Sequence, residues 1–385
     1  DTMDMDFMNL NQSAHGDREF GHICARMRKN RKVVVGHWQD EAAQKKIAAW
    51  MRVCAAWADV QDMLILRFGD QMNNVAVTDG DKVAAEQTLG YHVDYCPIND
   101  LMVYYRAVED ADTKALVEKY WAEYDHDPKL EESGMEAYTK VWNSAKAEIA
   151  LRRLLKDKGA KGFTTNFDDL GEFDQIPGLA SQRLMMEGYG FGAEGDWKTA
   201  ALYRTMWFMS QGMPKGCSFL EDYTLHFDGE KSAILQAHML EVCPLIAEAK
   251  PKLEVHRLSI GIDSETARLV FTSKQGEGVA ATIVDLGNRF RLIVNKVECI
   301  KSKPLPKLPV ASALWIPMPN LEVGAAAWIL AGGTHHTSFS YDLTVEYWED
   351  YAEMAGIEMV VIDENTTISE FKKELRMNEV YYMLN

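Results

Sequence analysis

Five side chains in the second half of the sequence belong to the types that bind divalent cations or move protons. They are Glu194, Glu221, His238 and the adjacent pair His335 and His336. Carboxylate oxygens and imidazole nitrogens suit ions such as Mn²⁺, Co²⁺ or Zn²⁺, and carboxylates are common general acids and bases. Taken singly, each is more often a hydrogen-bonded polar group than a ligand. The elements that carry them therefore decide whether they form one site.

Glu194 lies in a glycine-rich segment, 190–195, that matches the dinucleotide fingerprint G-x-G-x-x-G. That fingerprint must follow a strand, whereas the apolar pattern predicts a helix over 179–187 and a second helix with Asp196 as its N-cap. We therefore expect Glu194 on a loop between two helices. The glycines are then better suited to bringing backbone close to a ligand than to holding a nucleotide.

Glu221 falls in the segment 219–227, which reads as a strand. Alternation places Glu221, Tyr223 and Leu225 on one face, and a carboxylate that shares a face with apolar residues needs a partner. The segment 235–242 also reads as a strand.

In that second strand His238 and Glu241 would point to opposite faces, so a His-x-x-Glu metal pair is not predicted. The pair His335 and His336 follows the apolar run 327–331, which we interpret as a further strand.

The remaining pattern alternates helices and strands up to about residue 214 and is rich in strands after it. Expected helices cover 41–58, 82–87, 100–108, 113–124, 137–156, 345–355 and 368–375; expected strands cover 63–66, 162–165, 268–272, 279–284, 290–297 and 359–362. A chain of 385 residues and 43.6 kDa is expected to form two or three domains.

Bulk composition excludes several classes of function. A net charge of -17 repels nucleic acid and anionic lipid, and no apolar stretch approaches the length of a membrane span. The six cysteines form no C-x-x-C pair, which fits a reducing cytoplasm. A neutral sugar is indifferent to the negative field, and a divalent cation is attracted by it.

Several segments in the same order resemble the L-arabinose isomerase family over essentially the whole chain. They include Asn9-Leu10-Asn11-Gln12-Ser13-Ala14-His15-Gly16, Gly36-His37-Trp38-Gln39-Asp40, Arg67-Phe68-Gly69-Asp70, and the segments 177–180, 188–200, 219–227, 238–244, 305–311 and 328–337. The resemblance implies conversion of L-arabinose to L-ribulose, with D-galactose to D-tagatose as a further reaction, through a cis-enediol.

The resemblance also assigns roles to residues. It implies a metal held by Glu194, Glu221, His238 and His336, with Mn²⁺ as cofactor and Co²⁺ as a possible substitute. It makes Glu194 and Glu221 the catalytic pair, without deciding which is the base, and lines the substrate site with His15, Met72, Phe167, Tyr223 and His335. A homo-oligomer, a trimer or hexamer, is implied as well.

We accordingly predict a multidomain α/β protein. Residues 1–65 would be the remainder of an N-terminal α/β domain of which most precedes Asp1, 66–215 a central α/β domain, and 216–385 a C-terminal β-rich, barrel-like domain with a few helices. Two other functions stay open: a non-catalytic scaffold that binds metal or sugar, and a metal-dependent hydrolase, which the resemblance disfavours.

Overall fold

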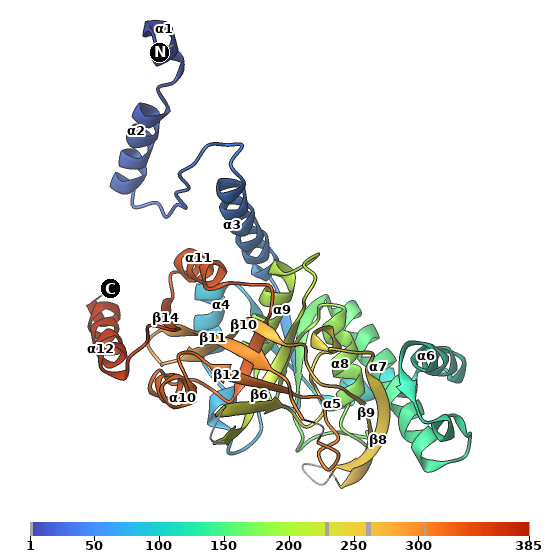
Figure 1. Cartoon of the computed structure of the whole chain (residues 1–385). Helices are drawn as coiled ribbons and strands as arrows, with labels where there is room; N and C mark the ends of the chain where they lie inside the picture. Colours follow the sequence, from blue (N-terminus) through green and yellow to red (C-terminus); the bar gives the residue numbers. More distant parts are fainter. Residues whose placement is uncertain (1–2, 228–230, 259–262, 304, 385) are drawn as a thin grey trace. The chain divides into compact units, whose positions relative to one another are not determined.

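The computed structural model describes residues 3–227, 231–258, 263–303 and 305–384 (Figure 1). The chain forms two compact units, Asp1–Met51 and Arg52–Asn385. The first unit contains α1 (Met5–Leu10), α2 (Ser13–Arg26) and the start of α3 (Glu41–Val60). Asp4 caps α1 by accepting a hydrogen bond from the backbone N–H of Phe7.

A four-stranded parallel sheet forms the first part of the second unit. Its strand order is β2-β1-β4-β5, and every neighbouring pair is parallel. Parallel strands place their carboxyl ends at one edge, and in open α/β sheets this is where ligands bind. The strands are β1 (Leu64–Phe68), β2 (His92–Cys96), β4 (Ala160–Thr165) and β5 (Gly190–Ala193).

Helices join and cover these strands. The longest, α7, and the later α9 both pack against β4. The helices are α4 (Lys82–Leu89), α5 (Ile98–Arg106), α6 (Asp110–Glu123), α7 (Glu136–Lys158), α8 (Gly178–Met186) and α9 (Trp197–Met209). The predicted α/β class and the predicted helices of this part are confirmed. The strand β5, which the glycine-rich sequence did not predict, is an addition.

The C-terminal part is a closed barrel of six strands. In the order β10-β13-β6-β7-β12-β11 all neighbours are antiparallel, and β11 pairs back with β10 along its length to close the ring. The strands are β6 (Cys217–His226), β7 (Ala233–Ala237), β10 (Gly276–Asp285), β11 (Phe290–Ile300), β12 (Ala313–Pro317) and β13 (His336–Ser340). The barrel-like prediction is therefore confirmed.

Other elements surround the barrel. β14 (Glu358–Ile362) runs parallel to β11 outside the ring, and β8 (Lys252–Leu258) pairs with β9 (Ser264–Val270) and with the short β3 (Asp125–His126). Three helices complete this part: α10 (Leu321–Leu330), α11 (Val345–Ala355) and α12 (Ile368–Leu384).

Two strand assignments in the C-terminal part are wrong. The run 327–331 lies at the end of α10, because Asn320 caps that helix through the backbone N–H of Val323 and apolar runs of this length do not distinguish helix from strand. The strand predicted over 235–242 ends at Ala237. His238 therefore lies beyond the strand, which matters for the site.

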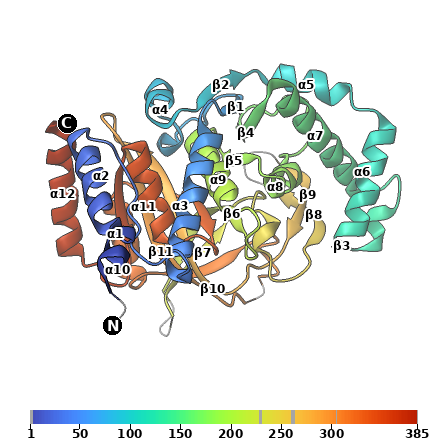
Figure 2. The ribbon, with the colours of Figure 1, turned by 90° about the horizontal axis from the view of Figure 1, so that it is seen from above.

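Helix α9 packs against both the parallel sheet and the barrel. It contacts β1, β4 and β5 of the parallel sheet and also β6, β10 and β13 of the barrel, and Figure 2 shows it beside β5 and β6. All six cysteines lie in the described part of the chain and are free thiols. Among the described residues, no helix combines the length and apolar character required to cross a membrane.

Asp59 ties α3 to the parallel sheet. Its carboxylate, 9% exposed, accepts from Lys161 Nζ of β4 at 2.8 Å and from Arg204 Nε of α9 at 2.7 Å. Burial raises the pKa of Asp59, but the bonds and charges of Arg204 and Lys161 outweigh it and lower the pKa below 3.8. A carboxylate with a lowered folded-state pKa stabilises the fold above its unfolded pKa, and the effect is lost as pH falls through the folded value.

We expect Asp59→Asn to lower the free energy of unfolding by about 2 kcal/mol at pH 7, because two partly buried cations lose their partner. The difference from wild type should shrink once the pH falls below about 4. Denaturant unfolding at several pH values measures this, with the 96% exposed Asp62 as Asp62→Asn control. A difference that is equal at pH 7 and pH 3 would contradict the role given to Asp59.

Candidate metal centre

The pairing of three barrel strands brings the candidate residues together. Glu221 of β6 lies opposite His336 of β13 on one side and opposite Ala237, the last residue of β7, on the other. His238 follows Ala237 directly. Glu221 and His336 are therefore directly opposite each other, and His238 is one residue beyond the position opposite Glu221. The sequence predicted Glu221 on a strand correctly but gave no information on its neighbours.

The alternation predicted along β6 holds only as far as Asp222. Asp222 lines the small cavity inside the barrel, where burial raises its pKa to about 6. The register then shifts between Asp222 and Thr224, which makes Tyr223 the extra residue of a β-bulge. The prediction that Glu221, Tyr223 and Leu225 share one regular face is therefore wrong.

Glu194 enters from the parallel sheet. It follows β5 directly and has a left-handed backbone, with φ 61°. Its carbonyl accepts from Met72 N at 3.1 Å, and the next amide, Gly195 N, donates to Thr164 Oγ1 at 2.9 Å. A non-glycine residue in this conformation is strained and persists only where its surroundings fix it.

The glycines around Glu194 allow two parts of the backbone to pack closely. A Cβ atom on Gly190 would lie 2.2 Å from Ala200 O, and one on Gly192 would lie 2.2 Å from Asp196 O. Both positions therefore bring β5 against the backbone at the start of α9. The expectation of a loop between two helices is wrong, because this segment is a strand followed by a tight turn into α9.

His336 is fully buried and lies between two carboxylates. Its Nδ1 lies 3.0 Å from Asp196 Oδ2, and its Nε2 lies 3.5 Å from Glu194 Oε2. Asp196 also caps α9 by accepting from Thr199 N and Thr199 Oγ1. Burial raises the pKa of Asp196, but the bond to His336 and neighbouring charge lower it overall.

His336 Nε2 has no hydrogen-bond partner in the described part of the chain, although it is buried. With Nδ1 engaged by Asp196, this nitrogen is the atom available to a cation, in the arrangement typical of carboxylate–histidine–metal sites. Burial lowers the pKa of His336. A neutral imidazole is the form that binds a metal.

His238 repeats this arrangement. Its Nδ1 lies 2.6 Å from Glu241 Oε2, and its Nε2 lies 3.9 Å from Glu221 Oε2. Because the chain leaves the strand after Ala237, His238 and Glu241 meet, so the prediction that alternation separates them is wrong. Burial lowers the pKa of His238, but the charges of Glu241, Glu221 and Glu194 raise it to about 9.

The four predicted ligands thus surround one region but are not equally close. His238 and His336 have ring centroids 5.7 Å apart, and both rings pack on Phe219. Among the described residues, the group whose ligand atoms all lie within 4.8 Å of one another is Glu194, His335 and His336. His335, predicted to line the substrate site, is therefore also placed as a possible ligand.

The Glu194 carboxylate lies among three histidines. Burial raises the pKa of Glu194, but the hydrogen bond from His335 and the charges of three histidines lower it overall. His335 Nε2 lies 3.4 Å from Glu194 Oε2, and this contact, against the opposing effect of burial, raises the pKa of His335. Glu194 is therefore ionised at neutral pH.

The predicted substrate-lining residues are distributed around this region. Phe167 is 4% exposed with its ring centroid 6.0 Å from that of His238, Met72 is linked through its N–H to Glu194, and Tyr223 is 39% exposed two residues beyond Glu221. His15 is an exposed residue of α2 in the first unit. Its place relative to the site stays a prediction.

Sequence reasoning missed two carboxylates. Asp196 was expected only as a helix cap, and Glu241 was expected to face away from His238. The cap signal was available from sequence, but its bond to a histidine 140 residues later was not.

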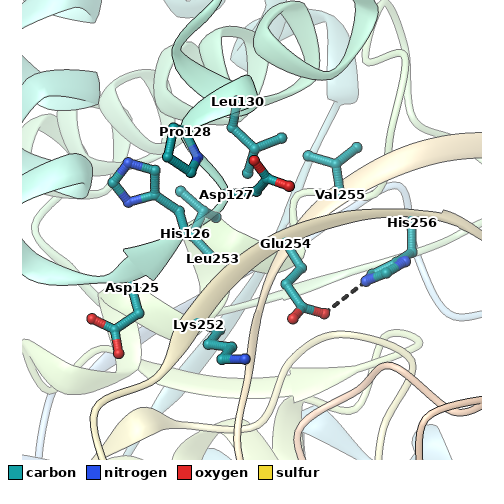
Figure 3. A pocket seen from close by; sticks show the side chains of 10 residues that line it. All are labelled: Asp125, His126, Asp127, Pro128, Leu130, Lys252, Leu253, Glu254, Val255 and His256. Atoms are coloured by element: carbon teal, nitrogen blue, oxygen red, sulfur yellow. Dashed lines mark hydrogen bonds and ion pairs between the residues drawn. The ribbon is translucent and has the colours of Figure 1, made fainter.

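A separate hollow of about 670 Å³ lies between β8 and the segment 125–130 (Figure 3). Its wall carries His126 and His256, and His256 Nε2 is paired with Glu254 Oε2 at 2.7 Å. None of the predicted site residues lines it. Its size alone gives it no chemistry.

Fold and site define a class of multidomain α/β protein in which a buried carboxylate–imidazole centre lies where a parallel sheet meets a closed barrel. Sequence models of the L-arabinose isomerase N-terminal, central and C-terminal domains match residues 1–62, 64–212 and 216–358. The chain belongs to the L-arabinose isomerase family.

Comparison with individual relatives supports the same family. The chain is 78% identical to an L-arabinose isomerase of Phocaeicola vulgatus and 77% identical to one of Bacteroides thetaiotaomicron, in each case over 100% of this chain and 77% of the relative. It is 52% identical to an L-arabinose isomerase of Geobacillus stearothermophilus over 99% of this chain and 77% of the relative.

We expect Gly192→Ala to lower the free energy of unfolding by about 2–3 kcal/mol, because its methyl group would overlap backbone that cannot move away without displacing α9. Denaturant unfolding measures the loss. Gly21→Ala is the matched control, since a Cβ atom there meets no atom within 4 Å. If Gly192→Ala stayed within about 0.5 kcal/mol of wild type, the close packing of β5 on α9 would not be what positions Glu194.

Proposed function

We propose that this chain converts an aldose to the corresponding ketose, L-arabinose to L-ribulose, and that D-galactose to D-tagatose is a second reaction of the same site. The observation that carries the proposal is the buried His336, whose Nδ1 is held by Asp196 and whose Nε2 faces the Glu194 carboxylate without a hydrogen-bond partner among the residues that the structure describes. Family membership supplies the reaction class.

We propose Mn²⁺ as the cofactor, with Co²⁺ as a substitute, held by Glu194, Glu221, His238 and His336. The mixed oxygen and nitrogen donors suit these ions, and Asp196 and Glu241 hold the outer nitrogens of the two histidines. When bound, such an ion supplies Lewis-acid polarisation of the sugar carbonyl. His335 is the alternative ligand, because it lies in the most compact group.

The glutamates transfer the protons. In this scheme one carboxylate takes the proton from C2 of the open-chain aldose and returns it to C1, while a proton moves from O2 to O1, so that the sugar passes through a cis-enediol and no atom is gained or lost. General acid–base catalysis of this kind requires a carboxylate within hydrogen-bond reach of both carbons. Glu194 and Glu221 are the proposed pair, and which of them is the base is left to experiment.

Met72, Phe167, Tyr223 and His335 are proposed to line the sugar pocket. The exposed edge of Tyr223 and the buried ring of Phe167 offer contacts of different polarity. His15 would act in the site of a neighbouring subunit, within a homo-oligomer, a trimer or hexamer. A cytoplasmic location, with neither nucleic acid nor membrane as partner, completes the proposal.

Ketose formation tests this function directly. The chain, stripped of metal, is incubated with L-arabinose or D-galactose with and without Mn²⁺, and ketose is detected chemically. We expect product only with Mn²⁺, and we expect Glu194→Gln and Glu221→Gln each to reduce kcat by at least about 100-fold, because each removes a proton-transfer group.

Glu254→Gln, whose carboxylate lines the separate hollow, is the control and should retain full turnover. Near-normal turnover in either site variant would remove that carboxylate from the scheme. Tight Mn²⁺ binding without any ketose would instead favour a non-catalytic scaffold that binds metal or sugar.

A further inference from the structure

Three neighbouring strands of the parallel sheet end in loops that meet beside Glu194. β1, β4 and β5 are adjacent in the order β2-β1-β4-β5, and their carboxyl ends lead into the segments 69–72, 166–169 and 194–196. Met72 lies on the first segment, Phe167 on the second and Glu194 on the third. One buried side chain, Asn166 of the middle segment, connects them.

We propose that Asn166 is a positioning residue that fixes the pocket wall formed by Met72 and Phe167 next to Glu194. The inference rests on the proposed isomerase function, which it deepens by assigning a determinant of sugar binding that does not itself touch metal or sugar. The evidence for this role is the set of hydrogen bonds made by the side-chain amide of Asn166.

The Asn166 amide nitrogen faces three successive carbonyl oxygens of the first segment. Asn166 Nδ2 lies 2.8 Å from Gly69 O, 3.2 Å from Asp70 O and 3.1 Å from Gln71 O. Its other end, Oδ1, accepts from Asp168 N at 2.6 Å. The side chain therefore donates to the segment before Met72 and accepts from the residue after Phe167.

The first segment needs such a restraint because its backbone is strained. Gly69 and Asp70 both have left-handed backbones, with φ 77° and 68°. For Asp70, which is not glycine, this conformation costs about 1 kcal/mol or more and persists only where neighbours impose it. Arg67 Nη1 adds two further contacts, at 2.9 Å from Asp70 Oδ1 and 3.5 Å from Gln71 Oε1.

The restrained segment reaches Glu194 in two ways. Met72 N donates to Glu194 O, and Gly195 packs so tightly on Gln71 that a Cβ atom at Gly195 would lie 2.4 Å from Gln71 Cα. Movement of the segment would therefore displace Met72 and loosen the turn that carries Glu194. His238 is held apart from these segments, by Glu241, and His336 is held by Asp196, which is fixed in turn as the cap of α9.

The chemistry of an amide is required at this position. Asparagine donates through Nδ2 and accepts through Oδ1, whereas an aspartate of the same shape cannot donate and would repel three carbonyl oxygens. Asn166→Asp is therefore the sharpest variant. Asn166→Ser, which is uncharged and too short to reach the carbonyls, is the second variant if the first does not fold.

Asn295→Asp provides a matched control. Asn295 is also 4% exposed and donates through Nδ2 to two carbonyl oxygens, Met318 O at 3.3 Å and Ile362 O at 3.2 Å, outside the three loops. It should lose stability as Asn166→Asp does. It should not change the binding of sugar.

Two measurements on the full chain test the proposal. Steady-state kinetics with L-arabinose in saturating Mn²⁺ should show KM raised about tenfold or more in the Asn166 variants, with a smaller loss of Mn²⁺ affinity, because the wall moves while, of the four proposed ligands, only Glu194 lies on the loosened turn. Amide hydrogen exchange of peptides covering 69–75 should be faster in these variants only.

Unchanged KM and unchanged exchange in a folded Asn166 variant would overturn the proposal. Equal changes of KM in Asn295→Asp would also overturn it, since the effect would then reflect general loss of stability. If the wild-type chain makes no ketose, the proposed function fails, while faster exchange in the Asn166 variants would still establish the restraint on the loop.

Discussion

The pairing of β13 with β6 in a single register is the constraint on which the centre depends. It places His336 opposite Glu221 and, through β7, brings His238 to the neighbouring position. A slip of β13 by one residue would turn His336 to the face of the sheet opposite Glu221. Closure of the barrel through β10 and β11 opposes such a slip, because every strand of the ring is paired on both sides.

The second contribution comes from the parallel sheet and reaches the barrel through α9. Asp196 begins this helix, holds His336 and follows Glu194 by two residues. The close approach of Gly190 and Gly192 to α9 fixes the distance between strand and helix. One short segment, 194–196, therefore carries the Glu194 carboxylate, caps α9 and binds His336.

Sequence patterns predicted much of the fold for identifiable reasons. The helix over 41–58 and the long helix over 137–156 have apolar residues at helical spacing, and α3 and α7 cover them. β5 was missed because glycines carry no strand preference, and this strand exists through its pairing with β4. The end of β7 at Ala237 was missed for a related reason, since nothing local marks it.

The candidate site was predicted in its residue types but not in its contacts. The resemblance to a family pointed to two glutamates and two histidines, and the register brings three of them together. The partnerships of His336 with Asp196 and of His238 with Glu241 depend on long-range pairing and on a strand end, which sequence periodicity does not encode. The proximity of His335 to Glu194 could not be predicted from the sequence either, because the two residues come from different sheets.

We propose that one cation is bound by Glu194, Glu221, His238 and His336. Anomalous diffraction at the manganese edge, from crystals of the chain grown with Mn²⁺, tests it most directly. We expect one strong peak in contact with all four side chains, with Asp196 and Glu241 still bound to the outer imidazole nitrogens. A peak held by Glu194, His335 and His336, with Glu221 and His238 out of contact, would contradict it.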